Sequence, residues 1–372
     1  MAFSFFKRSK PEPESRPAAS SHYRELTVLE VVHETRDAVS LVFAAPEKPL
    51  VYKPGQFLTL IFQIDGKEVR RAYSLCSSPH VDLNPSVAVK RVEKGQVSSL
   101  IVDTVKEGQR IKVMEPTGNF TTPFDPASKR HLIMFAGGSG ITPMMSIIKS
   151  LLTQEPESIC SLIYCNRDEH SIIFRSALDQ LQVRFEGRLH VIHVLDQAPM
   201  NWQGYSGLLN QSLLEQLFER IPDWGIDRSL YLMCGPEGMM KNVGDILAAR
   251  GIPSEKVMRE SFVQGTIDKA KKPEPEGESA AVTREVTIRY DGQEFKVSVP
   301  PGKTILETAL GQGIDLPYSC QSGLCTACRG KALSGKVKLD EEDGLSKSEM
   351  EEGYVLTCVG HPLTDDVVIE IG

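Results

Sequence analysis

The chain has 372 residues, and at a usual size of about 100 to 200 residues per domain this length predicts two or three domains. Hydrophobic residues make up 41% and charged residues 24%, the balance of a soluble globular protein. No apolar run approaches the roughly 18 residues needed to cross a bilayer, so the sequence excludes a membrane-embedded protein. The apolar residues 1–6 precede a basic stretch, the reverse of a signal peptide, which predicts a cytoplasmic location.

The net charge of −7 is placed unevenly along the chain. Residues 285–372 carry 15 acidic and 8 basic side chains, whereas the residues before them carry 34 of each sign. An acidic C-terminal region favours a partner with a basic patch and disfavours nucleic acid. The alternative is that the acidity only keeps a small domain soluble.

Two segments without hydrophobic periodicity are rich in Pro, Ser, Glu and Lys. They predict a disordered tail over residues 1–21 and a linker over residues 267–283. A linker of this composition either lets the last domain move between two partners or only separates the domains.

The periodicity between these segments predicts three folded domains. Residues 22–125 hold short β-rich runs separated by Gly, Pro and Asp, which indicates an antiparallel β-barrel. Residues 126–266 alternate apolar strands with helical patterns, which indicates an α/β doubly wound parallel sheet. Residues 284–372 begin with a predicted hairpin around Asp291-Gly292 and a helix over residues 304–310, which indicates a small α+β domain.

Four clustered cysteines give the most specific signal in the chain: Cys320, Cys325, Cys328 and Cys358. Their spacing is C-x4-C-x2-C followed after 29 residues by the fourth cysteine, the spacing of plant-type [2Fe–2S] clusters. A structural zinc site is the alternative, but zinc ribbons offer two C-x2-C pairs and only one is present. The sequence therefore predicts a [2Fe–2S] cluster.

A second candidate site follows a predicted strand near residue 71. Arg71, Tyr73 and Ser74 offer a cation for a pyrophosphate, an aromatic face and a hydroxyl, which a flavin cofactor requires. The segment from Gly95 to Ser98 opens a predicted helix, whose free N–H groups and dipole favour a phosphate. Either segment alone is also compatible with ordinary surface packing.

A third candidate site is the glycine-rich stretch that follows the predicted strand 131–136. Gly137, Gly138 and Gly140 let the backbone approach a pyrophosphate, and Pro143 suits the first turn of a helix. The pattern is G-x-G-x-x-P in place of the more common dinucleotide motif. It predicts a nicotinamide dinucleotide site.

Taken in this order, the second and third motifs resemble the ferredoxin–NADP reductase superfamily over residues 23–263. Residues 284–372 resemble plant-type ferredoxin domains, which have a β-grasp fold. The resemblance implies a flavin cofactor, with FAD favoured over the alternative FMN, that contacts Arg71, Ala72, Tyr73, Ser74, Val89, Lys90, Gly95, Val97 and Ser98. It implies that the coenzyme contacts Gly137, Gly138, Gly140, Thr142, Pro143, Asn166, Arg167, Arg175, Cys234, Gly235 and Pro236.

The resemblance also implies which side chains lie nearest the reacting rings: Tyr73, Ser74, Cys234 and Glu260. Phe262 would shield the flavin ring or belong to the core. Because Arg167 and Arg175 could together meet a 2′-phosphate, NADPH is favoured over NADH, although each arginine could equally be an ordinary surface residue.

The whole chain resembles reductase components of bacterial oxygenases, most closely that of phenylacetyl-CoA epoxidase. This implies an oxidoreductase that passes electrons from NADPH (or NADH) through FAD and the [2Fe–2S] cluster to a di-iron oxygenase component. The acceptor could instead be another hydroxylase, a desaturase or a hybrid-cluster protein. A permanently bound electron-transfer subunit and a redox sensor are further alternatives.

Overall fold

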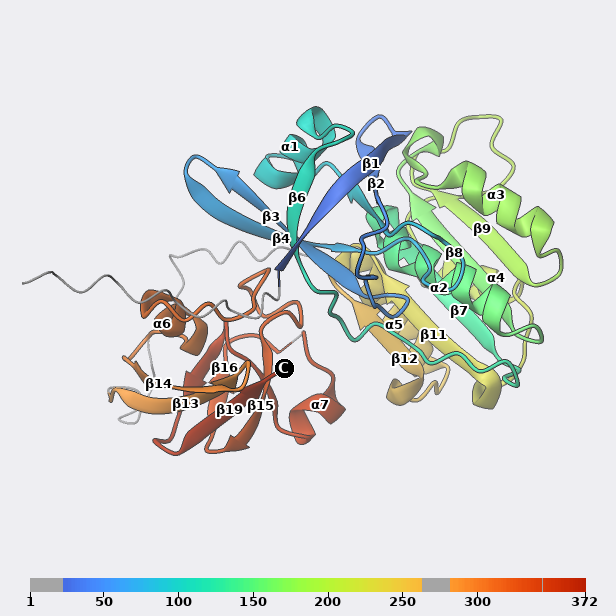
Figure 1. Ribbon diagram of the computed structural model, residues 1–372. Coiled ribbons are helices and arrows are strands. Elements are labelled where there is room, and N and C mark those ends of the chain that lie inside the picture. Colours follow the sequence, from blue (N-terminus) through green and yellow to red (C-terminus); the bar gives the residue numbers. More distant parts are fainter. Residues whose placement is uncertain (1–22, 263–281, 343) are drawn as a thin grey trace, which may run out of the picture.

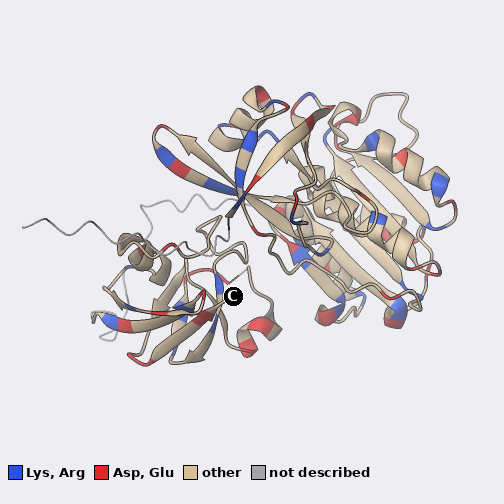
Figure 2. Cartoon of the chain, in the orientation of Figure 1, with Lys and Arg blue, Asp and Glu red and all other residues tan. Residues whose placement is uncertain are grey.

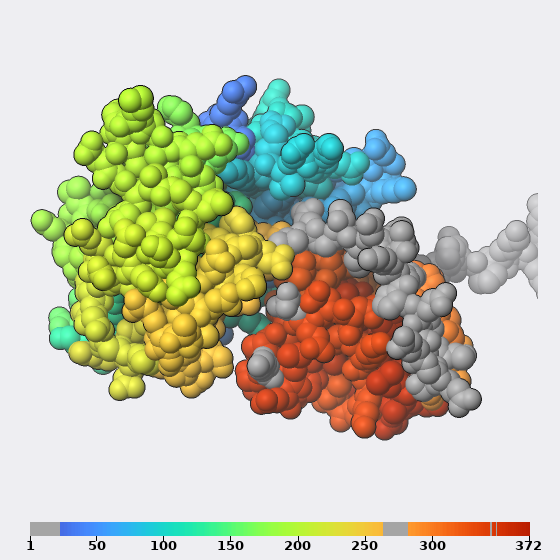
Figure 3. Space-filling model, turned by 180° about the vertical axis from the view of Figure 1, so that it is seen from behind, coloured from blue at the N-terminus to red at the C-terminus, as the bar shows by residue number. Residues whose placement is uncertain are grey.

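The protein is described by a computed structural model that covers residues 23–262, 282–342 and 344–372 (Figure 1). The predicted tail and all but the last two residues of the predicted linker lie outside the described residues. The described residues form a barrel module (β1–β6 and α1), a parallel-sheet module (β7–β12 and α2–α5) and a C-terminal module (β13–β19, α6 and α7). Seen from behind, the C-terminal module lies against the other two (Figure 3).

The barrel module is a six-stranded antiparallel sheet in the order β4-β3-β6-β1-β2-β5. A bridge between Leu75 and Val87 joins the end of β4 to β5 and closes the sheet into a barrel. Alternate residues such as Leu58 and Leu60 point inward because successive side chains of a strand face opposite sides. Its elements are β1 (Tyr23–Thr35), β2 (Ala38–Phe43), β3 (Phe57–Ile64), β4 (Lys67–Ser74), β5 (Ser86–Lys90), α1 (Gln96–Thr104) and β6 (Arg110–Met114).

The parallel-sheet module has the strand order β10-β9-β8-β7-β11-β12, with every pair parallel. The strand order reverses between β7 and β11, and ligands of such sheets bind at this switch point, beyond the carboxyl ends of the strands. Its strands are β7 (His131–Gly137), β8 (Ile159–Asn166), β9 (Leu189–Leu195), β10 (Tyr205–Ser206), β11 (Ser229–Cys234) and β12 (Val257–Glu260). Its helices are α2 (Ile141–Gln154), α3 (Arg175–Arg184), α4 (Gln211–Phe218) and α5 (Glu237–Ala249).

Two separate cores cover the two faces of this sheet. Leu132 and Met134 of β7 face one core with α2 and α3, while Ile133 and Phe135 face the other with α4 and α5. The first core continues into the barrel module, where Phe120 belongs to it. The barrel and the parallel sheet are therefore held together by shared apolar packing.

The C-terminal module is a mixed five-stranded sheet in the order β14-β13-β19-β15-β17, with a separate core. Strands β13 and β19 are parallel, and α6 packs on the sheet beside β14. Its strands are β13 (Arg284–Tyr290), β14 (Gln293–Val299), β15 (Arg329–Ser334), β16 (Val337–Leu339), β17 (Tyr354–Leu356), β18 (Gly360–Pro362) and β19 (Val367–Ile371). Its helices are α6 (Ile305–Gly311) and α7 (Lys347–Glu351).

The predicted fold class is confirmed in all three modules. The strands β15–β19 were not predicted, because short strands around a ligand loop carry little periodicity. Phe174 is the N-cap of α3, with a left-handed backbone (φ 61°). Within the described residues, no helix is long and apolar enough to span a bilayer.

Candidate functional site

The loop between α6 and β15 carries three of the four clustered cysteines. Its tight path depends on left-handed backbone at Gln321 (φ 54°) and Gly323 (φ 76°). A Cβ at Gly323 would lie only 2.7 Å from Cβ of Glu341, so a side chain cannot be accommodated there. The N–H of Gly344 donates to the Gly323 carbonyl at 2.9 Å and holds the covering segment against the loop.

The fourth cysteine reaches the loop through strand pairing. Strands β15 and β17 are antiparallel, with Arg329 opposite Leu356, so the residues flanking this pair also meet. The hydroxyl and the N–H of Thr357 both donate to the Cys328 carbonyl, at 3.1 and 3.2 Å. The 29-residue gap between Cys328 and Cys358 is thus closed by the sheet itself.

The four thiols lie within reach of one another. Hydrogen bonds from Cys325 and Cys358 lower the pKa of Cys320, and a hydrogen bond from Cys358 lowers that of Cys328. The N–H of Ser322 donates to Sγ of Cys320 at 3.4 Å. No three of the described His, Cys, Asp or Glu side chains converge on one metal ion, and a [2Fe–2S] cluster needs only two thiolates on each iron.

Unpaired hydroxyls around this loop fit an inorganic cluster. Oγ of Ser319, Oγ of Ser322 and Oγ1 of Thr326 are buried and have no hydrogen-bond partner among the described residues. Buried hydroxyls normally find an acceptor, and the sulfides and thiolates of a cluster would supply one. The loop therefore fits the predicted [2Fe–2S] cluster in ligand set and in its polar surroundings.

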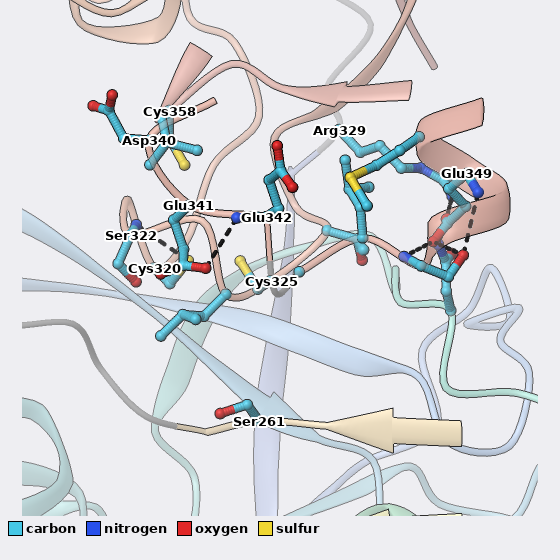
Figure 4. A pocket seen from close by; sticks show the side chains of 18 of the residues that line it. Ser261, Cys320, Ser322, Cys325, Arg329, Asp340, Glu341, Glu342, Glu349 and Cys358 are labelled. Atoms are coloured by element: carbon cyan, nitrogen blue, oxygen red, sulfur yellow. Dashed lines mark hydrogen bonds and ion pairs between the residues drawn. The ribbon is translucent and has the colours of Figure 1, made fainter. Parts of the chain in front are cut away.

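A cavity of about 2380 Å³ opens where the three modules meet. Each module lines it, through Arg71 and Ser74 of the barrel, Glu260 and Phe262 at and after the end of β12, and Cys320, Cys325 and Cys358 of the C-terminal module. Figure 4 shows Ser261, which follows β12, across the cavity from Cys320 and Cys325. The structure thus joins sequence motifs nearly 250 residues apart in one site.

The barrel wall of the cavity has the groups expected for FAD. The Arg71 side chain lines the cavity, and its Nη1 atom donates to the Arg70 carbonyl oxygen at 2.7 Å. Oγ of Ser74 is buried and has no partner among the described residues. Tyr73 packs on the barrel core, and this burial raises the pKa of its phenol. A cation and an unpaired hydroxyl facing one cavity fit a flavin nucleotide.

Other predicted flavin contacts are placed differently by the structure. Val89, Val97 and Ser98 are buried, and Oγ of Ser98 accepts from the Val92 N–H at 3.0 Å, so a cofactor could meet only their backbone. Gly95 is the N-cap of α1, as predicted. Lys90 faces the other module, with Nζ 3.6 Å from the place a Cβ would take at Gly138.

The two glycine loops of the parallel sheet pack on each other at the switch point. A Cβ at Gly140 would lie 2.0 Å from the Cys234 carbonyl oxygen, and one at Gly137 would lie 2.5 Å from Cδ of Pro236. Only glycine permits this approach between the loops that follow β7 and β11. Thr142 and Pro143 are buried in the first turn of α2, where Oγ1 of Thr142 donates to the Ser139 carbonyl at 2.9 Å.

Cys234 and Glu260 are neighbours at the carboxyl ends of β11 and β12. Burial raises the pKa of Cys234 well above its usual range, and ionisation of the neighbouring Glu260 would raise it further, so Cys234 is a neutral thiol. Burial also raises the pKa of Glu260 to about 8. Its Oε2 atom is buried with no partner among the described residues. The pair forms a region of low charge beside the cavity.

The two arginines expected at a 2′-phosphate are already paired. Nε of Arg167 lies 3.0 Å from Oδ2 of Asp168, and Nη1 of Arg175 lies 2.5 Å from Oε1 of Glu169. The hydrogen bond from Arg167 lowers the pKa of Asp168, which keeps this carboxylate ionised. Asn166 is buried at the end of β8. The positive charges of the two arginines are therefore neutralised by their acidic partners.

Three family models match the chain in the order of its modules. They describe an oxidoreductase FAD-binding domain over residues 25–122, an oxidoreductase NAD-binding domain over residues 134–245 and a 2Fe-2S iron-sulfur cluster binding domain over residues 288–363. One subunit of the 1,2-phenylacetyl-CoA epoxidase of Escherichia coli is 36% identical, over 94% of this chain and 97% of its own length. The chain belongs to this family of ferredoxin-reductase components.

Two further similarities agree with this family. The ferredoxin reductase component of 3-ketosteroid-9-alpha-monooxygenase from Rhodococcus rhodochrous is 38% identical, over 93% of this reductase and 96% of its own length. The structure of phthalate dioxygenase reductase has the same fold, with a TM-score of 0.57 at 23% identity, over 94% of this chain and 98% of its own. The reductase is thus an NAD(P)H oxidoreductase with FAD and a [2Fe–2S] cluster.

Several residues of this reductase site were not predicted from sequence. The hydroxyls of Ser319, Ser322 and Thr326 stand among the cysteines, and their position in the motif could have indicated them. Arg70 and Asp315, which join the barrel to the C-terminal module, carry no local signal. Such contacts depend on how the modules pack, which no motif records.

The buried carboxyl of Glu260 predicts a particular pH dependence of stability. In the folded chain Glu260 keeps its proton up to about pH 8. In the unfolded chain the same carboxyl has its ordinary pKa of 4.5 and releases the proton at lower pH. Between these values the free energy of unfolding should therefore fall as pH rises, and it should fall less in Glu260→Gln. Urea unfolding at pH 5, 6.5 and 8 measures this difference.

The matched control is Glu255→Gln, an exposed carboxyl in the segment before β12, which should follow the wild type at every pH. A constant gap between the wild type and Glu260→Gln across the three pH values would contradict the burial of this carboxyl.

Proposed function

We propose that this reductase delivers electrons, one at a time, to the oxygenase component of a multicomponent monooxygenase. The observation that carries the proposal is the single cavity lined by Arg71, Ser74, Glu260 and the cluster cysteines. When bound, FAD supplies the ability to take two electrons from a nicotinamide and release them singly, and the cluster supplies a one-electron outlet. The protein residues bind and orient these groups.

In this proposal Arg71 neutralises the pyrophosphate of FAD, and the Ser74 hydroxyl donates to the flavin ring, with Tyr73 beside it. The first N–H groups of α1, after Gly95, offer further donors to a phosphate. Phe262 is 39% exposed and lines the cavity, which supports a ring-covering role over a place in the core.

The coenzyme is assigned to the switch point between β7 and β11. Gly137, Gly138 and Gly140 let its pyrophosphate approach the start of α2, with Lys90 as a nearby cation. The nicotinamide would lie beyond the carboxyl ends of β11 and β12, beside Cys234 and Glu260. Because both groups are held neutral at pH 7, they add no charge that would oppose hydride transfer.

For the coenzyme itself the ion pairs favour NADH, in contrast to the preference for NADPH drawn from the arginines alone. A dinucleotide site that accepts NADP needs an unpaired cation for the 2′-phosphate, whereas an acidic residue after the second strand suits the free hydroxyl of NAD. Asp168 follows the second strand, β8, by two residues. Its carboxylate and that of Glu169 oppose a phosphate.

The proposed acceptor, an oxygenase component, is inferred from the acidic surface near the cluster cysteines and from the similar reductase components. Acidic residues lie on α7 and at the cavity rim, where Asp340, Glu341 and Glu342 adjoin the cysteines (Figure 2, Figure 4). Such a surface favours a basic patch on the acceptor. A cytoplasmic location is proposed with this role, supported by the four cysteines outside the cluster motif, which form no disulfide in the described part of the chain.

Arg71→Ala should lower the flavin content of the purified protein, because the cavity loses its barrel-side cation. The measurement is flavin released per chain, read by absorbance. Arg110→Ala removes an exposed, ion-paired arginine from the same barrel and should retain full flavin content. Normal flavin content in Arg71→Ala would contradict the role of this residue.

Cys358→Ser should abolish reduction of a one-electron protein acceptor such as cytochrome c, while reduction of ferricyanide by the flavin persists. The reason is that only the cluster loses a ligand. Cys160→Ala alters a buried thiol of β8 and should leave both activities in place. Loss of both activities in Cys358→Ser would show that the two cofactor sites do not function separately.

The coenzyme proposal predicts a kcat/KM for NADH at least equal to that for NADPH. Asp168→Asn combined with Glu169→Gln frees both arginines and should raise kcat/KM for NADPH by up to about tenfold, with little change for NADH. The control, Asp245→Asn, breaks an exposed ion pair on α5 and should change neither value. A strong preference of the wild type for NADPH would refute the proposal.

A further inference from the structure

Arg70 is a buried charged side chain of the barrel module that contacts two residues of the C-terminal module, Asp315 and Tyr318. The side chain is only 4% exposed. Its guanidinium lies 3.0 Å from Oδ1 of Asp315 and 4.2 Å from the centre of the Tyr318 ring. On its own module it pairs with Glu68 at 2.7 Å. A buried guanidinium needs such partners, because an unpaired charge away from water is strongly destabilising.

Neighbouring groups extend this contact on both sides. The hydroxyl of Tyr23 donates to Oδ2 of Asp315 at 2.6 Å, so both oxygens of this carboxylate face the barrel module. The Tyr23 ring in turn lies 4.2 Å below Nζ of Lys112 and 5.3 Å from the Arg70 guanidinium. The close approach of the guanidinium to two aromatic rings and the hydrogen bonds to both carboxylate oxygens tie this contact together.

The contact is connected to both cofactor sites through very short stretches of chain. Tyr318 stands two residues before Cys320. Arg71 follows Arg70 on β4, and successive side chains of a strand face opposite sides, so Arg70 faces the docked module while Arg71 lines the cavity. A shift at Arg70 would therefore move the cluster loop relative to the flavin site.

A second polar contact lies elsewhere between the same two modules. Nδ2 of Asn119 donates to the carboxylate of Glu349, which also pairs with Arg329. Arg329 directly follows Cys328. Among the described residues, the core of the C-terminal module includes none from the barrel. These polar contacts, rather than a shared core, therefore define how the two modules dock.

We propose that Arg70 is a positioning residue, which docks the C-terminal module on the barrel through Asp315 and Tyr318 and so holds the cluster loop at the flavin cavity. This rests on the proposed function, because the docking serves the transfer of one electron from reduced flavin to oxidised cluster. No bond is made or broken in that transfer, and the distance between the two groups controls its rate.

The test uses the full chain with FAD and cluster bound, and the double variant Asp315→Asn, Tyr318→Leu. These substitutions remove the carboxylate and the stacking ring while leaving Arg70, Glu68 and the flavin cavity intact. Tyr318→Phe keeps the ring and is the conservative control. Asp365→Asn is the second control. It breaks a 2.9 Å ion pair with Arg284, the first residue of β13 in the same module, and leaves Asp315 and Tyr318 unchanged.

Two measurements are made on each protein. Hydrogen exchange should become faster in residues 67–74 and 312–319 of the double variant only. Stopped-flow absorbance should show flavin reduction by the coenzyme at the wild-type rate, and cluster reduction at least about tenfold slower. Flavin content and the oxidised cluster spectrum should match the wild type, which excludes simple loss of a cofactor.

Unchanged hydrogen exchange in both segments would overturn the docking role of Arg70. Faster exchange with an unchanged rate of cluster reduction would overturn the claim that this docking positions the cluster. If the coenzyme reduces no cluster even in the wild type, the proposed function itself fails, and the hydrogen exchange still decides whether the docking contact exists.

Discussion

The docking of the C-terminal module on the barrel is the constraint on which the rest of the site depends. Electron transfer falls steeply with distance, so a flavin and a cluster on separate domains function together only if those domains meet with both sites facing inward. In this chain Arg71 and Ser74 share one cavity with Cys320, Cys325 and Cys358. The proposed transfer of electrons from the flavin to the cluster depends on this docking.

The two interfaces of the barrel module differ in kind. Apolar residues such as Phe120 join it to the parallel sheet in one continuous core. With the C-terminal module it instead makes polar contacts around Arg70 and Asn119. Polar interfaces between domains generally permit relative motion, whereas a shared core does not. The nicotinamide and flavin sites therefore form one unit, and the cluster is carried by a separately docked module.

Local electrostatics also differ along the proposed route. At the ends of β11 and β12, burial keeps Cys234 and Glu260 neutral, in a place where the family resemblance implied side chains beside the reacting rings. At the end of β8, Asp168 and Glu169 cancel the arginines that the sequence suggested as phosphate ligands. In both places the charge state of these residues depends on burial and on adjacent partners, which the sequence alone does not give.

The amino-acid sequence by itself determined the module order, the fold class and the cofactor set. Those signals are local: four cysteines with a characteristic spacing, glycines between a strand and a helix, and a short Arg-x-Tyr-Ser segment each carry their chemistry within a few residues. Only the tertiary structure decided that Thr357 ties Cys358 to Cys328, that the motifs share one cavity, and that Arg70 meets Asp315. These contacts join residues far apart in the chain, and packing brings them together without leaving a periodic or motif-like trace.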